Sequence, residues 1–273
     1  MIVVISRQVG SLGDEIAIEV AKRLSYQLVD QIQVHHLAKA CDPEFAKACT
    51  LYEKELEPGF FERFFFSNVG YATLFESLNY ELASRGNVIL IGRGAQIVLK
   101  DIPGVFKARI VAPRDVRVKR IAQQQGTTYD EAFDFVNRYD NQRRALIRTL
   151  FDQDLKDWDL YDLILNTNNY DLETGSDIIC HALELIPKNM DEEAFKEQLA
   201  RMAFAKKVES KIKKRFPPSP YRNIGVTMKD KEVLTLSGFV SEMTTKETAG
   251  EIASKAEGIT KVENQIMVTK LST

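Results

Sequence analysis

The stretch from Met1 to Leu24 limits the possible folds more than any other part of the chain. Residues 2–5 form an unbroken β-branched apolar run, which is typical of a strand buried on both faces of a parallel sheet. A turn with glycines at positions 10 and 13 follows, and from Asp14 the apolar residues recur at helical spacing. A strand, a glycine turn and a helix in this order direct backbone N–H groups toward a phosphate. The stretch indicates either a phosphate-binding loop or an ordinary strand-to-helix turn.

The glycine turn differs from a conventional phosphate-binding loop. That loop has the pattern G-x-x-x-x-G-K-[ST], in which the lysine contacts the β- and γ-phosphates and the hydroxyl binds Mg²⁺. In this chain Gly13 stands at the lysine position, and Asp14 follows it. Glycine in such a turn can also meet a purely steric need, so the motif alone leaves both interpretations open. Ser11, or Arg7 reaching over the loop, could supply part of the missing polar chemistry.

Composition and charge narrow the class of protein. The chain has 273 residues, 44% hydrophobic and 28% charged, as expected for a globular protein with one large and one smaller domain. No apolar run reaches the length of a membrane span and no signal peptide is evident, so a cytoplasmic location is predicted. Residues from Pro187 onward carry 16 Lys or Arg and 12 Asp or Glu, against 21 and 27 before it. A basic surface this small argues against nucleic-acid binding.

A second turn has features of an anion site. The apolar run at residues 88–91 predicts another buried strand, and Gly92, Arg93 and Gly94 follow it. Ligands of α/β proteins bind at the carboxyl ends of such strands. Flanking glycines let a fork-shaped guanidinium approach an anion closely, although a tight turn with a solvated arginine is the alternative.

Two predicted helices concentrate arginines. Helical spacing covers residues 115–125, and Thr128 with Glu131 forms a capping box for a helix that extends to about Phe151. Such charges usually form a solvated helix face. Here they are concentrated within an acidic domain, which suggests a mobile lid that closes over a polyphosphate. The arginines of this helix pair are Arg117, Arg120, Arg138, Arg143, Arg144 and Arg148.

Strands alternate with helices from residue 1 to residue 186, which predicts a parallel, doubly wound sheet. The segment from Cys41 to Gly70 is harder to interpret. It includes five phenylalanines, at positions 60, 61, 64, 65 and 66, which fit core packing or a homodimer contact better than a base-stacking platform.

Taken together, these motifs resemble the cytidylate-kinase-like family of P-loop nucleoside monophosphate kinases over roughly residues 1–186. The resemblance rests on the order of five pieces rather than on any single one. They are Ile5-Ser6-Arg7 with Gly10-Ser11 and Gly13, Ile91-Gly92-Arg93-Gly94-Ala95, Ala112-Pro113 with Arg117, Asp140 with Arg143 and Arg144, and Tyr161-Asp162-Leu163-Ile164-Leu165-Asn166-Thr167.

The resemblance implies a P-loop kinase-like parallel sheet with an arginine-bearing helical lid, and ATP and Mg²⁺ as cofactors. It implies phosphoryl transfer from ATP to CMP, dCMP or a related small acceptor. The alternative is a nucleotide-binding sensor with little or no catalysis, because Gly13 replaces the lysine. No protein side chain is assigned to a metal. The implied site residues are Arg138, Arg143 and Arg144 for catalysis, Asp30 and Arg93 for the acceptor, and Arg7, Gly10, Ser11, Gly13 and Arg117 for ATP phosphates.

The C-terminal part predicts a small α+β domain. Residues 187–203 are expected to be a linker or helix, and residues 204–273 follow an αββαβ order. The stretches "LSGFV" and "GITKVENQIMV" resemble a BON domain, which implies a phospholipid or another small ligand; a dimerisation or docking domain is the alternative. A basic helix is expected from Ala205 to Phe216. Its lysines and arginine face either an anionic membrane or only water, if the helix packs on its own sheet.

Overall fold

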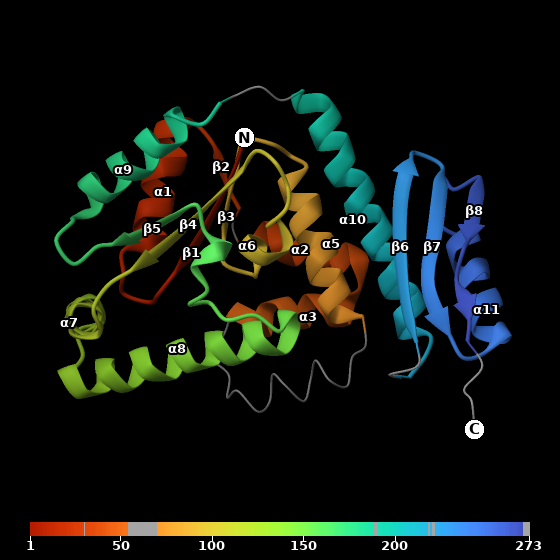
Figure 1. Cartoon of the computed structure of the whole chain (residues 1–273). Helices are drawn as coiled ribbons and strands as arrows, with labels where there is room; N and C mark the ends of the chain where they lie inside the picture. The colour runs from red at the N-terminus through yellow and green to blue at the C-terminus, as the bar shows by residue number, and fades with distance from the viewer. Residues whose placement is uncertain (30, 54–69, 188–190, 218, 220–221, 270–273) are drawn as a thin grey trace.

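A computed structural model of the chain describes residues 1–29, 31–53, 70–187, 191–217, 219 and 222–269. Two sheets are present, and one long helix lies between them (Figure 1). Asp30, which the sequence suggested for the acceptor, lies outside the described residues. So do the five phenylalanines for which core packing or a homodimer contact was predicted. Among the described helices, none is both long enough and apolar enough to cross a bilayer.

The first sheet has five parallel strands in the order β2-β3-β1-β4-β5, which confirms the predicted doubly wound architecture. Its central strand, β1, pairs with β3 on one side and with β4 on the other. Strands β1 and β4 are neighbours, but the chain leaves them in opposite directions. After β1 it continues to β2 at one edge of the sheet, and after β4 it continues to β5 at the other edge. The strands are β1 (Ile2–Arg7), β2 (Gln27–Leu28), β3 (Val88–Ile91), β4 (Val105–Val111) and β5 (Leu163–Asn166).

Helices cover both faces of this sheet because β1 alternates between two cores. Val3 and Ile5 pack with α1 (Gly13–Leu24) and α9 (Leu172–Glu184). Ile2 and Val4 belong to the core on the opposite face. That face carries α2 (Gln31–Cys41), α3 (Pro43–Glu53), α5 (Tyr71–Ala83) and α6 (Ala95–Val98).

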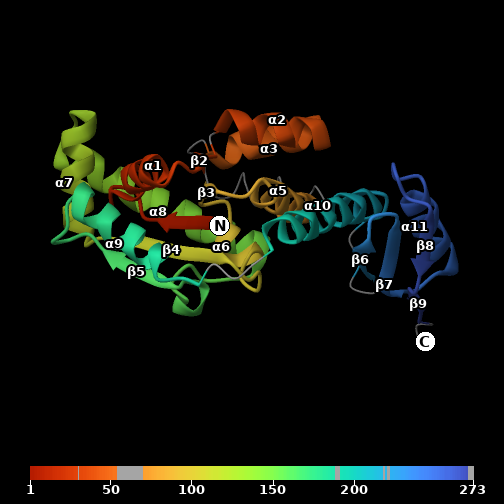
Figure 2. The same cartoon turned by 90° about the horizontal axis from the view of Figure 1, so that it is seen from above.

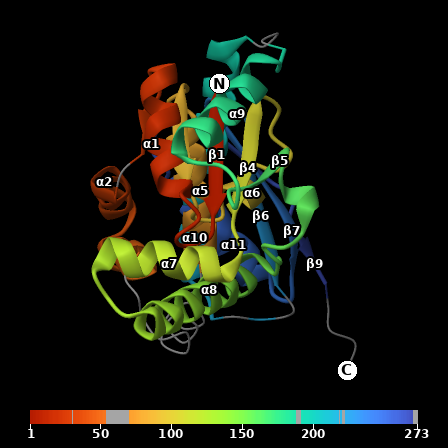
Figure 3. The same cartoon turned by 90° about the vertical axis from the view of Figure 1, so that its left-hand side faces the viewer.

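The two arginine-bearing helices lie at the carboxyl edge of the sheet. Figure 3 shows α7 (Arg114–Gln125) and α8 (Tyr129–Phe151) at the end toward which the β1 arrow points. The predicted capping box is confirmed, since Thr128 and Glu131 each bond the backbone N–H of the other. Both helices therefore stand beside the glycine turn.

The second sheet belongs to the C-terminal domain. Strands β6 (Asn223–Asp230) and β7 (Val233–Val240) are antiparallel, and α11 (Met243–Ser254) follows them. The predicted single last strand is wrong: it is divided into β8 (Lys261–Asn264) and β9 (Met267–Val268), both parallel to β7. At the division the N–H of Ile266 donates to the side-chain oxygen of Asn264 at 3.3 Å, and the side chain of Ile266 is buried in the core.

Helix α10 (Glu192–Lys214) contributes to both domains (Figure 2). It starts well before Ala205, the predicted beginning of the basic helix, because Asp191 accepts hydrogen bonds from two N–H groups of its first turn. Leu199 packs in the core beside α5, whereas Ile212 packs in the core of the second sheet. The division of the chain near residues 186 and 204 remains a prediction.

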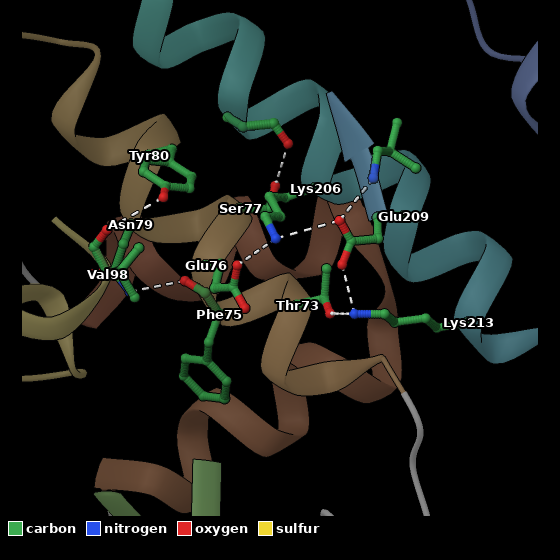
Figure 4. Close-up of polar contacts among 12 residues, drawn as sticks. Thr73, Phe75, Glu76, Ser77, Asn79, Tyr80, Val98, Lys206, Glu209 and Lys213 are labelled. Carbon is green, nitrogen blue, oxygen red and sulfur yellow. Dashed lines mark hydrogen bonds and ion pairs between the residues drawn. The ribbon is translucent and has the colours of Figure 1, made fainter. Parts of the chain in front are cut away.

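Three lysines in the second half of α10 form contacts within the protein. Lys206 pairs with Glu76 of α5 at 2.7 Å, and Lys214 pairs with Asp42 (Figure 4 shows the first contact). Lys213 pairs with Glu209 of its own helix at 2.5 Å and donates to Thr73 at 3.1 Å. These contacts favour the interpretation in which the helix packs inside the protein over one in which its lysines face a membrane.

Candidate functional site

The glycine turn between β1 and α1 has a backbone conformation at Leu12 that normally favours glycine. If Gly13 marks the lysine position, the pattern G-x-x-x-x-G-K places Arg7 and Leu12 where glycines would stand. Leu12 adopts the left-handed conformation with φ 65°, which is costly for a residue with a side chain. The loop therefore retains a conformation suited to glycine at a position where glycine is absent.

Two arginine side chains of α7 hold this loop in place. Arg117 is only 3% exposed; its guanidinium donates to the carbonyls of Val9 and Ala112 and pairs with Asp140 at 2.9 Å. Arg120 donates to the carbonyl of Gly10 and to both oxygens of Thr167. Arg117, which the sequence suggested as an ATP ligand, thus joins the loop to α8 instead of lining the cavity.

Ser11 also faces inward. Its side chain is fully buried, and its hydroxyl donates to the carbonyls of Gln8 and Ile110 at 2.7 and 3.2 Å. The structure therefore offers no support for the idea that this hydroxyl supplies polar chemistry to a phosphate.

A cavity of about 60 Å³ lies between the end of β1, strand β4 and helix α8. It stands where the connections of two neighbouring parallel strands diverge, the usual ligand position in such sheets. Five of its side chains are basic and two are carboxylates, so the lining is cationic. The lining residues are Arg7, Gln8, Arg109, Tyr139, Asp140, Arg143, Arg144, Asp154, Leu155 and Lys156.

Arg109 is a cavity residue that the sequence analysis missed. It is 9% exposed, donates to the Ser6 hydroxyl at 2.6 Å and lies 5.7 Å from the centre of the Tyr161 ring. Burial lowers the pKa of this guanidinium. Its partners Ser6 and Tyr161 are neutral, and no carboxylate lies within ion-pairing distance of it among the described residues, although the nearby charge of Asp140 acts to raise its pKa. A signal was present, because two charged residues, Lys107 and Arg109, interrupt the apolar strand Phe106–Ala112.

The predicted catalytic arginines of α8 are not equivalent. Arg143 and Arg144 line the cavity, whereas Arg138 is exposed and is not part of the lining. Arg143 donates to the Tyr139 hydroxyl at 2.9 Å, and Arg144 donates to Asn141 at 3.2 Å. Of the cations in the second half of the helix, Arg143 and Arg144 thus face the cavity.

The predicted acceptor arginine lies in a strained turn at the end of β3. Gly92, Arg93 and Gly94 have φ values of 67°, 58° and 70°, so three successive residues are left-handed. Such a conformation is costly for arginine and is typical of functional sites. Arg93 is buried, and its carbonyl accepts a hydrogen bond from Asn79 of α5 at 3.3 Å. The turn is therefore fixed from the side of α5.

The same turn contacts the end of the lid helix. A Cβ atom added at Gly94 would lie 2.2 Å from Cε2 of Phe151, the last residue of α8. The ring thus occupies the space that a larger residue would need. The turn that carries Arg93 and the helix that carries Arg143 and Arg144 are in direct contact at this point.

The described residues contain no cluster of three or more His, Cys, Asp or Glu side chains able to hold a metal ion. A Mg²⁺ ion is commonly held by one or two carboxylates together with the phosphates of a nucleotide. Asp14, in the first turn of α1 and 53% exposed, provides one such carboxylate beside the loop. The donor set thus fits an ion that arrives with a nucleotide.

The motifs and the fold agree with a comparison against known families. The family described as "Cytidylate kinase-like family" matches residues 2–169, more than half of the chain. The chain belongs to this family. In this cytidylate kinase-like chain a second match, to the BON domain, covers residues 204–270.

Individual relatives match a shorter stretch. The cytidylate kinase of Pyrococcus horikoshii is 33% identical over 104 residues, which is 38% of this chain and 53% of that protein. The cytidylate kinase of Methanocaldococcus jannaschii is 30% identical over 114 residues, 40% of this chain and 62% of that protein. The chain thus spans between half and two thirds of the length of these relatives.

One solved structure supports the fold. An uncharacterized protein from Eubacterium ventriosum superposes with a TM-score of 0.52 at 18% identity, covering 68% of this chain and 99% of that one. At this identity the likeness concerns the fold alone.

Proposed function

We propose that this protein transfers a phosphoryl group from ATP to a nucleoside monophosphate, such as CMP or dCMP, or to a related small phosphate acceptor. The observation that carries the proposal is the cavity between the glycine loop and α8, where five basic side chains face two carboxylates. Phosphoryl transfer depends mainly on positioning and on neutralising the charge of the phosphates, and a cationic chamber suits both needs.

The residues divide into three roles in this proposal. The loop around Gly10 and Gly13 holds the donor phosphates, and Mg²⁺ bound with ATP neutralises part of their charge. Arg143 and Arg144, with Arg109 beneath them, stabilise the phosphoryl group during transfer. The acceptor lies beside Arg93, on the side where the sequence also placed Asp30.

Helix α8 has to move for this reaction. Pockets for small molecules usually occupy about 300–1,000 Å³. The observed cavity of about 60 Å³ is far smaller, and residues of α8 form one side of it. We expect α8 to open for nucleotide entry and to close during transfer, as lids of such enzymes do.

A sensor of ATP without turnover is the second candidate, and Gly13 favours it because the loop lacks its usual lysine. A coupled assay of ADP release over CMP, dCMP, UMP and AMP distinguishes the two. Turnover with any of these acceptors would exclude a sensor that has no catalytic activity. Tight ATP binding without turnover for any acceptor excludes the enzyme among these substrates.

Variants of α8 make this assay more specific. Changing Arg143 and Arg144 together to Met should lower turnover by at least about 100-fold, because both cations face the cavity. Arg148→Met is the matched control, since Arg148 lies on the same helix and outside the lining. Equal activity of the double variant and the control would contradict the role given to α8.

We also propose that the BON-like domain binds a phospholipid or another small anionic ligand, and that the protein works in the cytoplasm, where nucleotides are available. On α10, Lys207 and Lys211 have no ion-pair partner among the described residues, so they are the cations left to meet such a ligand. Co-sedimentation of the whole protein with phosphatidylserine vesicles at low and high salt tests this. Pelleting only at low salt supports an electrostatic contact, and no pelleting at either salt contradicts it.

A further inference from the structure

The departures of the loop from the conventional pattern fall on the positions that carry its charge. The lysine position holds Gly13, the hydroxyl position holds Asp14, and the first glycine position holds Arg7. Relative to the conventional pattern, the lysine at the start of α1 is missing, and an arginine, Arg7, is present instead at the end of β1. The two changes are physically connected.

The connection is steric. A Cβ atom added at Gly13 would lie 2.3 Å from Cβ and 2.8 Å from Cγ of Arg7. Non-bonded carbon atoms prefer about 3.5–4.0 Å, so a side chain at position 13 and the observed side chain of Arg7 exclude each other. Gly13 therefore leaves room for the arginine to cross the loop.

The crossing brings the guanidinium to a defined place. Nε of Arg7 lies 3.0 and 3.2 Å from the two carboxylate oxygens of Asp14, and Arg7 also lines the cavity. Its side chain is 17% exposed, whereas that of Asp14 is 53% exposed. A cation and a carboxylate thus stand together beside the loop, at the edge of the site.

From this arrangement we propose that Arg7 is the phosphate-binding cation of this loop and that Asp14 binds the Mg²⁺ ion of the nucleotide. This inference rests on the proposed function. Without nucleotide the two side chains neutralise each other. When Mg²⁺ and nucleotide bind, the guanidinium contacts a phosphate and the carboxylate contacts the ion. A guanidinium suits this role because its N–H groups match two phosphate oxygens at once.

Calorimetric titration of the full-length protein with MgATP tests the role of Arg7. Arg7→Met keeps the aliphatic stem over Gly13 and removes the charge, so affinity should fall about 10- to 100-fold. Arg23→Met is the matched control, because Arg23 also pairs with carboxylates, Glu19 on α1 and Asp177 on α9, but lies outside the cavity lining. The control should bind MgATP like the natural protein.

The role of Asp14 is tested by comparing ATP affinity with Mg²⁺ and with EDTA. In the natural protein Mg²⁺ should strengthen ATP binding. In Asp14→Asn this advantage should shrink by about tenfold, while ATP binding in EDTA should be unchanged or tighter because Arg7 is released. An unchanged Mg²⁺ advantage would overturn the metal role of Asp14.

A double-mutant cycle tests the exclusion between positions 7 and 13 independently of catalysis. Gly13→Lys alone should lower the melting temperature, whereas Arg7→Gly together with Gly13→Lys should restore it and recover the MgATP affinity that Arg7→Gly loses. Additive effects would overturn the proposed replacement.

The outcomes separate this inference from the proposed function. If the natural protein binds MgATP and Arg7→Met binds it equally well, the inference fails and the proposed function stands. If the natural protein binds no MgATP, both fail. If Arg7→Met binds weakly but the natural protein transfers no phosphate, the inference stands and only the sensor function remains.

Discussion

Lys206 of α10 forms an ion pair with Glu76 of α5, and its Nζ lies only 3.3 Å from the carboxylate of Glu209 (Figure 4). Burial alone would lower the pKa of Lys206, but the two carboxylates raise it above its ordinary value. Glu209 is 3% exposed and also accepts the N–H of Val226 in β6. One buried carboxylate therefore connects the first domain to the second.

We expect Glu209→Gln to lower the free energy of unfolding by about 3 kcal/mol, because the variant leaves Lys206 and Lys213 without their shared buried counter-charge. Urea unfolding followed by circular dichroism measures this. Glu197→Gln is the control: Glu197 pairs with Arg201 and Lys231 near the surface of the same helix, and its loss should cost less than about 1 kcal/mol. Similar losses in both variants would show that burial of Glu209 is unimportant.

Gly94→Ala should destabilise the protein and loosen the end of α8, since the added methyl group meets the ring of Phe151. Overpacking of this kind costs about 1–3 kcal/mol. Gly126→Ala is a matched control, because Gly126 has φ 66° but nothing lies within 4 Å of its added Cβ. The difference between the two melting temperatures isolates the contact with Phe151. Equal shifts would mean that only backbone strain matters.

Arg109→Met should separate stability from binding. Removing a buried charge that has only neutral hydrogen-bond partners should leave the free energy of unfolding unchanged or raise it. MgATP or inorganic phosphate should bind about tenfold more weakly, because the cavity loses a fixed cation. A variant that unfolds more easily and binds phosphate normally would assign Arg109 a structural role instead.

Stability should fall in alkaline solution because of Tyr71, at the start of α5. Burial, with Asp42 and Glu44 nearby, raises the pKa of its hydroxyl from 10.0 to about 12. The unfolded chain then loses this proton at lower pH than the folded protein does, so the stabilisation is complete below pH 10 and decreases between about pH 10 and 12. Tyr71→Phe should show a weaker decrease over this range in thermal melts. An identical pH profile for the variant would rule out Tyr71 as the cause.

The sequence predicted the elements whose signals are local. The strand at residues 2–5, the glycine turn and the capping box of Thr128 each depend on neighbouring residues, and all three are present. Helix α3 was not predicted, although Asp42 caps it by accepting N–H groups of Glu44 and Phe45. Its mixed composition gives weak periodicity, so its position depends on packing against α2.

The candidate site was harder to predict, because it depends on which strands are neighbours. Arg109 meets Ser6 only because β4 pairs with β1, and no local pattern contains that pairing. The inward orientation of Ser11 and the engagement of Arg117 depend equally on distant carbonyl groups. The sequence correctly placed these arginines on helices, but which of them line the cavity depends on tertiary contacts.

Helix α10 packs in the cores of both domains, and this affects how the protein folds during its synthesis. A ribosome releases the first sheet and its helices before residues 192–214 emerge, so the core beside α5 lacks Leu199 and Ala203 during that interval. Domains made early generally fold first, and exposed apolar surface invites aggregation. The first domain of this chain therefore completes its core only when the helix that begins the second domain arrives.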